Sequence, residues 1–514
     1  MWGWRSSRTI AVTTAVAGLA LFCLMPLAYM MAVSLSDSGR GTSVWRALAL
    51  DSRQRGLLFN TAVLGAGTAL TASLVGMPLG LALARVRLPF KAGLRMVLAA
   101  PALLPSYIVG LAWLSLGEAS SMPSLAAAVV VLTVVLYPIS MLLTEAAVRG
   151  IEPRLEEAAS LATTPGRVLV RITLPLVMPS VLAAALVIFV LAVSDFGVPA
   201  LLRVPVYTTE IFTAFAAFYD VGRATALAVP LLALTLIVAF VSVRLAGEHI
   251  VTTRRGLAGG EPETFERWRW PAAVVVTSVV LSALVVPVAT LAREARQVSA
   301  WDLVLAGSGD AIWNSLSLAA VGATLVSAFA IGLGYARARA GHGAGVAADV
   351  LFIVLFAVPG TIVGVALIGL WNRPGPVGAI YGTHGMFLLA YLARFTPLAA
   401  LALAATVRRV SSSQEEAAAV SGAGWFRTMT RIVLPQTTLG LLGVWVIVFT
   451  LAFGELGASV LVTPPGESTL PIRIYTLIAN APPAHVAALA LLQTAVIVLP
   501  LAVFGLGFGV RRRA

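Results

Sequence analysis

Long uninterrupted apolar blocks constrain this chain more than any other feature of its sequence. Twelve blocks reach the length of about 20 residues that an α-helix needs to cross a hydrocarbon core of about 30 Å. Hydrophobic residues make up 59% of the 514 residues and charged residues only 11%, which is too few charges for a soluble domain. A β-barrel would show short alternating segments instead. We therefore predict an all-α polytopic membrane protein.

The predicted spans fall into two sets of six. They lie near residues 10–33, 58–84, 94–117, 123–147, 177–201 and 223–246, and near 271–292, 313–337, 347–371, 383–406, 436–462 and 484–509. The first span follows Arg5 and Arg8 and resembles a signal peptide. Its apolar run is too long for one, so we expect it to remain as the first helix.

Basic residues are distributed unevenly between the two sides of the predicted membrane. With the N-terminus in the cytoplasm, 24 Lys and Arg lie inside and 10 outside, which predicts that both termini are cytoplasmic. The local exception is the first outer loop, with Arg40, Arg46, Arg53 and Arg55. The net charge of +13 is spread among short loops, so the expected partner is the lipid bilayer with its anionic headgroups, and not nucleic acid.

The two halves of the chain repeat each other. Short motifs recur in the same order at offsets of 254 to 260 residues: Phe59-Asn60 with Trp313-Asn314, Pro105 with Pro359, Glu156-Glu157-Ala158-Ala159 with Glu415-Glu416-Ala417-Ala418, Ile172-Thr173-Leu174-Pro175 with Ile432-Val433-Leu434-Pro435, and Asp195 with Glu455. Because six is even, both copies point the same way across the membrane, and a pathway would lie on the axis between them. We predict repeats at 1–246 and 271–514 and a cytoplasmic linker at 247–270.

The cytoplasmic loops at 149–175 and 408–435 share one plan. An acidic start leads into small residues, a break follows, and a second amphipathic stretch ends in Leu-Pro. Carboxylates suit a helix N-terminus, and we expect the proline to stop the second helix before the next span. Each loop is predicted to present a helix–turn–helix knob to the cytoplasm. A merely solvated loop is the alternative, and two copies in register argue against it.

These loops resemble the EAA loops of binding-protein-dependent ABC importer permeases, whose pattern is E-A-A, a Gly, then I-x-L-P. The second loop matches at Glu416, Ala417, Ala418, Gly422, Ile432, Leu434 and Pro435. The first has Glu156, Glu157, Ala158, Ala159, Gly166, Ile172, Leu174 and Pro175, but Thr163 stands where Gly is expected and the loop is one residue shorter. The resemblance implies that each loop docks on an ATPase subunit, and that the second loop couples more tightly.

The resemblance also implies a type I importer permease fold in a bacterial inner membrane, with two copies of an ATPase and a separate periplasmic or lipid-anchored binding protein. The only lysine, Lys91, precedes Ala92, so the chain has no Gly-Lys-Ser/Thr phosphate loop. ATP is therefore expected on the partner. This chain is predicted to be a transport subunit, not an enzyme, and to bind no cofactor itself.

Three charged residues fall within or near the ends of predicted spans, where a charge is expensive and usually faces a pathway or a partner. Arg394 lies in the tenth span, and Asp195 and Glu455 lie at equivalent positions of the two repeats. We interpret them as residues of the translocation pathway or of an outer gate. Arg394 paired with a carboxylate for structure alone, or carboxylates that reach the outer headgroups, are the alternatives.

The strings at 194–199, 207–211, 454–458 and 464–475 resemble the ferric-iron subgroup of these permeases. Thiamine, 2-aminoethylphosphonate, polyamine and sulfate permeases are the alternatives within the family. The histidines are scattered and Cys23 is alone, so no metal site is predicted in this chain. A secondary transporter is the more distant alternative, but it would favour inverted repeats and would not need twin cytoplasmic loops.

Overall fold

The protein is described by a computed structural model that covers residues 2–36, 52–117, 122–247 and 268–511. Every regular element in these ranges is helical, as predicted for an all-α membrane protein. The first half comprises α1 (Trp2–Leu19), η1 (Ala20–Leu24), α2 (Met25–Ser36), α4 (Ser52–Arg85), α5 (Lys91–Ala99), η2 (Ala100–Leu103), α6 (Ser106–Ser115), α8 (Ser124–Arg149), α9 (Pro153–Ser160), α10 (Pro165–Val168), η3 (Leu169–Thr173), α11 (Leu174–Ser194), α12 (Gly197–Leu201), α13 (Tyr207–Ala216) and α14 (Val221–Gly247).

The second half repeats this order. It comprises α15 (Arg269–Val280), η5 (Leu281–Val285), α16 (Val286–Glu294), α17 (Val298–Gly307), α18 (Gly309–Ala338), α19 (His342–Phe356), α20 (Gly360–Trp371), η6 (Pro376–Ile380), α21 (Gly385–Val407), α22 (Ser412–Val420), α23 (Trp425–Thr428), η7 (Met429–Val433), α24 (Leu434–Phe453), α25 (Ser459–Val462), α26 (Leu470–Leu477) and α27 (Pro483–Arg511). The predicted linker at 247–270 lies almost entirely outside the described residues.

Ten helices in the described ranges are long and apolar enough to cross a membrane, and two further spans are broken. The predicted spans at 94–117 and 347–371 are each a pair of helices bent by 90°, Lys91–Leu103 with Ser106–Ser115 and His342–Phe356 with Gly360–Trp371. Each bend falls at a proline, Pro105 or Pro359, and the residue before a proline is driven out of the helical region. The two predicted spans are therefore present as helix pairs, each broken at a proline.

Pro175 and Pro435 do not stop the second loop helices, contrary to the sequence prediction. The helices run unbroken over Pro165–Ser194 and Trp425–Phe453, so each span begins inside the loop that precedes it. The backbone widens into a π-turn just before each proline: the Leu174 amide donates to the Leu169 carbonyl, and the Leu434 amide to that of Met429. A π-turn accommodates proline, which lacks an amide hydrogen and would clash with the carbonyl four residues earlier.

Two helix pairs form the centre of the fold, α4 with α8 and α18 with α21. Small residues let their backbones approach closely. A Cβ added at Gly76 would lie 2.5 Å from the Tyr137 carbonyl oxygen, and one at Gly80 would lie 2.5 Å from that of Met141. Close approach through glycine is the usual packing of helices in lipid, where burial of apolar surface gives no net drive.

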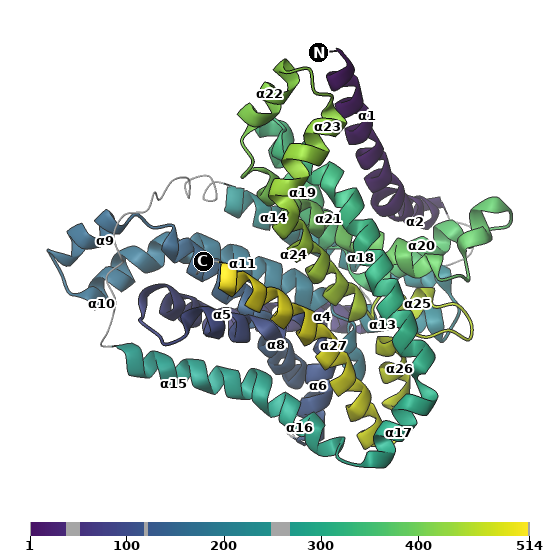
Figure 1. The fold of residues 1–514 in the computed structure, drawn as a ribbon. Helices are drawn as coiled ribbons and strands as arrows, with labels where there is room; N and C mark the ends of the chain where they lie inside the picture. Colours follow the sequence, from purple (N-terminus) through teal and green to yellow (C-terminus); the bar gives the residue numbers. More distant parts are fainter. Residues whose placement is uncertain (1, 37–51, 118–121, 248–267, 512–514) are drawn as a thin grey trace.

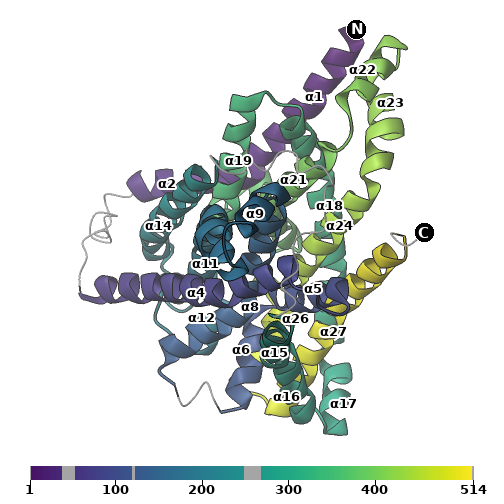
Figure 2. The ribbon, with the colours of Figure 1, turned by 90° about the vertical axis from the view of Figure 1, so that its left-hand side faces the viewer.

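The first span of each half packs against the other half. Helix α1 lies along α18 and α23, and α15 and α16 lie along α4, α5 and α6 (Figures 1 and 2). Two contacts of the first span show how closely it packs on the other half. A Cβ added at Gly332 would lie only 2.8 Å from the Ala15 Cβ. The Cys23 thiol donates a hydrogen bond to the Ala393 carbonyl at 3.4 Å. The two halves are therefore interlocked and not merely side by side.

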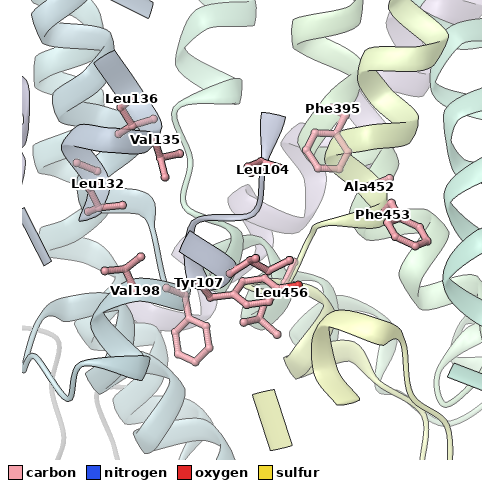
Figure 3. Close-up of a cluster of buried hydrophobic side chains, with 14 of the residues drawn as sticks. Leu104, Tyr107, Leu132, Val135, Leu136, Val198, Phe395, Ala452, Phe453 and Leu456 are labelled. Atoms are coloured by element: carbon pink, nitrogen blue, oxygen red, sulfur yellow. The ribbon is translucent and has the colours of Figure 1, made fainter. Parts of the chain in front are cut away.

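A layer of buried side chains joins the halves. Leu104, Tyr107 and Val198 of the first half face Phe453 and Leu456 of the second (Figure 3). The Tyr107 hydroxyl donates to the Gln493 side-chain oxygen at 2.7 Å, so α6 is tied to α27 across the interface. This layer surrounds the polar groups described next.

Candidate functional site

A buried ion pair anchors the first loop, at 149–175, to the membrane domain. Glu156, in the first turn of α9, lies 2.6 Å from the guanidinium of Arg85 at the end of α4. Its other oxygen accepts a hydrogen bond from Thr173 at 2.7 Å, and Arg85 also donates to the Val148 carbonyl. Because both charges are buried and hydrogen-bonded, the pair fixes the position of α9 relative to α4.

The second loop is anchored in the same way. Glu415, in the first turn of α22, pairs with Arg339 just after α18 at 2.5 Å and accepts a hydrogen bond from the Tyr335 hydroxyl at 2.8 Å. Arg339 also donates to the Val410 carbonyl. Arg85 and Arg339 are 254 residues apart, an offset found among the repeated motifs. We call these two ion pairs, Arg85–Glu156 and Arg339–Glu415, the loop clamps.

The neighbouring glutamates and the loop tips point away from the clamps. Glu157 and Glu416, the first residues of the two E-A-A strings, are exposed, as are Ala158 and Ala417. At the tips, Leu161 is 91% exposed and Val420 is 90% exposed. Exposed apolar side chains on a rigid turn are typical of a surface that docks a partner.

The two loops turn by different backbone routes. Gly422 has a φ of +80°, a conformation that favours glycine, and the amide of Ala423 donates to the Ala418 carbonyl. Thr163, at the corresponding place, is not among the residues with positive φ, and its amide donates to the Ala159 carbonyl. The first loop therefore makes its turn without a left-handed residue, so it does not require a glycine at Thr163.

The remaining residues of the motif lie on the helix that leads into the membrane. Gly166 is exposed on α10, and Ile172 and Ile432 are half-buried within the π-turns. Leu174 and Leu434 begin α11 and α24, one residue before the exposed Pro175 and Pro435. Ala159 and Ala418 are half-buried against the loop's own second helix.

The three charged residues interpreted as a pathway come together between the two halves. Arg394 of α21 lies 3.7 Å from Glu455, and Asp195 is near enough to interact with the charge of Arg394. The two carboxylates follow α11 and α24 directly, at the breaks that precede the short helices α12 and α25. We call Asp195, Arg394 and Glu455 the axial cluster.

Both carboxylates of the axial cluster cap short helices. Asp195 accepts from the Val198 amide at 2.8 Å and from the Ser106 hydroxyl at 2.5 Å. Glu455 accepts from the amides of Ala458 and Ser459 at 2.9 and 2.8 Å. These bonds satisfy amides that have no partner within a helix, so the carboxylates are fixed in place.

Arg394 has spare hydrogen-bonding capacity. Its Nη1 is buried, and in the described part of the chain it has no hydrogen-bond partner. The guanidinium occupies the space beside Gly360, where any larger residue would collide with it. The repeat places Ser106 at the position of Gly360, so glycine in the second half makes room for a charge that the first half does not carry.

The axial cluster is closed off by its surroundings. Leu104, Tyr107, Phe196 and Leu456 around it are all at most 5% exposed. Phe196 also packs against the Tyr475 ring of α26, with ring centroids 5.7 Å apart. Apolar side chains of both halves thus meet around the cluster, while the Arg394 side chain itself stays 23% exposed.

Several residues of these sites were not found from the sequence. Arg85 and Arg339 were counted only as inside charges, and Tyr335 and Gly360 were not singled out. The repeat offset was a usable signal for the two arginines, because it brings both to the ends of equivalent spans. In the described ranges, no group of three or more His, Cys, Asp or Glu could hold a metal ion.

Comparison with known proteins gives relatives of one kind. The chain is 23% identical over 478 residues to the Fe(3+)-transport system permease protein FbpB 2 of Haemophilus influenzae, covering 90% of this chain and 92% of that protein. It is 32% identical over 197 residues to the molybdenum transport system permease protein ModB of Mycobacterium bovis, 36% of this chain and 72% of that protein.

A third relative is shorter in coverage. The putative 2-aminoethylphosphonate transport system permease protein PhnV of Salmonella paratyphi A is 28% identical over 152 residues, 29% of this chain and 56% of that protein. No family model matches the chain. The similarity to the ferric-iron permease therefore spans both halves, whereas the other two similarities are partial.

Proposed function

This chain belongs to the permease subunits of ABC importers, and from that premise we propose that it conducts ferric iron, delivered by a separate binding protein, across the inner membrane. It is a multi-pass membrane protein and a transport subunit. We further propose that it consists of two permease repeats, 1–246 and 271–514, that it binds no cofactor, and that both termini are cytoplasmic.

The pair of clamped loops carries the proposal. Each loop is a short helix held by a buried ion pair at one end and exposing an apolar tip at the other. Such a rigid knob can transmit movement, because force on the tip is passed through the clamp to α4 or α18. Two equivalent knobs fit two copies of an ATPase subunit, which would supply the ATP site that this sequence lacks.

Iron as the cargo rests on the extent of one similarity. The ferric-iron permease matches nearly the whole of this chain, including both repeats. The molybdenum permease has the higher identity over a shorter stretch and supports an oxyanion as the second candidate. Thiamine, polyamine and sulfate remain candidates only through the resemblance of the motifs.

We propose that the axial cluster is part of the gate. Asp195 belongs to the first half, whereas Arg394 and Glu455 both belong to the second and lie 3.7 Å apart. Parting of the halves would carry Asp195 away from Arg394 and Glu455, which stay together in the second half, and would leave each carboxylate on its own capping amides. The cluster would then close the pathway when the halves meet and release it when ATPase movement separates them.

The experiment is transport by the purified complex in vesicles. Iron-loaded binding protein is added outside, ATP inside, and uptake of ferric iron is measured against uptake of molybdate. We expect ATP-dependent iron uptake. Uptake of molybdate but not of iron would contradict iron as the cargo. Uptake driven by an ion gradient without ATP would contradict the proposal that the protein is part of an ATP-driven importer.

The loops are tested by binding of the ATPase. Val420→Asp places a charge on the exposed tip of the second loop and should release the ATPase from the purified complex. Val377→Asp, at an exposed position of η6 outside both loops and outside the membrane spans, is a control for the added charge. Release by both variants, or by neither, would contradict the assigned docking surface.

A further inference from the structure

A cavity of about 250 Å³ lies beside the first loop and has no role in the proposed pathway. It is bounded by the end of α4, by the start of the helix that leads from the loop into the membrane, and by α15 from the other half. Its lining is almost wholly apolar and includes Leu79, Ala82, Leu169, Trp268 and Ala272. The only charged lining residue is Arg85 of the first loop clamp.

The second half fills the corresponding space with its own side chains. There, Trp425 is 6% exposed and packs edge-on against Tyr335, with ring centroids 5.7 Å apart, and Ala11 of α1 packs on the same cluster. The repeat places Pro165 at the position of Trp425 and Leu81 at that of Tyr335. The cavity therefore lies where the first half lacks a counterpart of the Tyr335–Trp425 aromatic pair.

Arg85 places one positive charge in the wall of the cavity. Arg85 is 5% exposed, and its terminal nitrogen Nη2 serves Glu156 and the Val148 carbonyl. Its Nε is buried and has no hydrogen-bond partner among the described residues. Arg85 therefore contributes a buried positive charge to the wall of the cavity, which favours an anionic ligand over a neutral one.

Basic and aromatic residues surround the cavity at the level of the inner headgroups. Arg167 is next to the lining residue Gly166, and Arg269 lies between the lining residues Trp268 and Pro271; both arginines are exposed. Trp268 and Trp270 are exposed at the start of α15, where tryptophan commonly marks the membrane interface. In Figure 1 this end of α15 lies at the same end of the molecule as α9 and α10.

We propose that the cavity binds one anionic phospholipid of the inner leaflet. An acyl chain fills the apolar volume beside Leu79, Ala82 and Ala272. The phosphate lies among the exposed arginines at the rim, and the buried charge of Arg85 adds to their attraction for it. Apolar depth below a basic rim is the arrangement that selects an anionic lipid over a neutral one.

The bound lipid would support the first loop in place of an aromatic pair. It would contact Leu169, on the helix that continues from the loop, and Arg85, which holds Glu156. This role rests on the proposed function, since it assumes that the loop faces the cytoplasm and docks the ATPase. The binding itself is measured without ATPase or cargo, so its failure and the failure of the importer are distinguishable.

The test is lipid retention by the purified full-length chain. The chain is released from nanodiscs made of equal parts phosphatidylglycerol and phosphatidylcholine with the same acyl chains, and bound lipids are counted by native mass spectrometry. We expect one retained phosphatidylglycerol per chain. Ala272→Phe, which fills the cavity, should abolish its retention, and Val274→Phe, at an exposed position on the same helix, should not.

The basic rim is tested separately, so that the proposal does not rest on a variant that fails to fold. Arg167→Gln should weaken phosphatidylglycerol retention about fivefold, because one basic side chain at an anionic surface contributes about 1 kcal/mol. Arg427→Gln is the matched control, since it is the same change at the same place of the second loop, where Trp425 fills the space. Equal retention of the two lipids, or unchanged retention in Ala272→Phe, would overturn the proposal.

Discussion

Single charged residues decide how the two halves are held to each other and to the loops. Glu415 is buried against Arg339 and Tyr335, whereas its neighbour Glu416 is exposed. The sequence shows two adjacent glutamates, and only their contacts separate an anchor from a surface residue. The same division holds for Glu156 and Glu157 of the first loop.

Glu415→Gln is expected to lower the stability of the second loop region by about 3 kcal/mol, because removing one partner of a buried ion pair leaves the other charge uncompensated. Glu416→Gln should change stability by less than about 0.5 kcal/mol, as for most surface substitutions. Hydrogen exchange of residues 408–435 in the purified chain measures the difference. Equal exchange in the two variants would mean that the Arg339–Glu415 clamp does not hold the loop.

Gly360→Ser should displace the guanidinium of Arg394 from its place beside Glu455, and transport should fall at least as far as in Arg394→Gln. Serine is tolerated at the equivalent Ser106 because no arginine occupies that space in the first half. Gly369→Ser, on the same helix with only an ordinary contact to Tyr29, is the control. Uptake by vesicles containing assembled complex is the measurement, and normal uptake by Arg394→Gln would remove the axial cluster from the mechanism.

At the scale of elements, the cytoplasmic loops are continuous with the membrane. Each span begins within its loop, and a π-turn carries the helix past Pro175 or Pro435. The same device appears in the first span of each half, before Pro26 and Pro287. A loop that is part of a span can pass movement into the membrane without an intervening hinge.

Gly422→Ala should weaken ATPase docking, because an alanine in this left-handed turn costs about 1–2 kcal/mol and reshapes the tip. Gly424→Ala, at a φ of −68° with open space around it, is the control. The first loop turns without such a residue, so Thr163→Ala should have a smaller effect than Gly422→Ala. Retention of the ATPase through gel filtration is the measurement, and equal defects in both loops would leave their different turns without a consequence for docking.

At the scale of the whole molecule, exchange of the first spans joins the halves. Helix α1 packs on the second half and α15 on the first, while α16 lies between α6 of the first half and α27 of its own. The basic first outer loop also fits this picture: Arg53 lies 2.8 Å from Glu210, which also pairs with Arg223. A local excess of outside charge is thus compensated in part by an acidic residue far along the chain, while Arg40 and Arg46 lie outside the described residues.

Because of this exchange, neither half should form a stable membrane protein alone. Residues 1–246 and 271–514 expressed separately should be degraded or aggregate, since each lacks the helix that covers its own core. Expressed together, they should co-purify and bind the ATPase as the intact chain does. Gel filtration of each half in detergent is the measurement, and a monodisperse 1–246 fragment would contradict the interlocked arrangement.

The class of the fold, the family and the number of spans could be predicted from the sequence, except that two of the spans are broken into helix pairs. These follow from segment length, apolar content and repeated motifs, which are local properties of the chain. A proline within an apolar block indicates a possible bend, and bends do occur at Pro105 and Pro359. At Pro175, however, the helix continues through the proline without a bend. Which of these occurs depends on the neighbouring helices.

Tertiary structure alone decided the partners. Only the folded chain shows that Glu156 and Glu415 are the anchors and that Arg394 contacts Glu455. It also shows that the first spans pack against the opposite halves, and that a cavity lies where Trp425 has no counterpart. Each is a contact between residues far apart in sequence, selected by the space and the unpaired polar groups that packing leaves. The twin loops could therefore be read from their motif, while the way they are held to the membrane could be seen only in the folded chain.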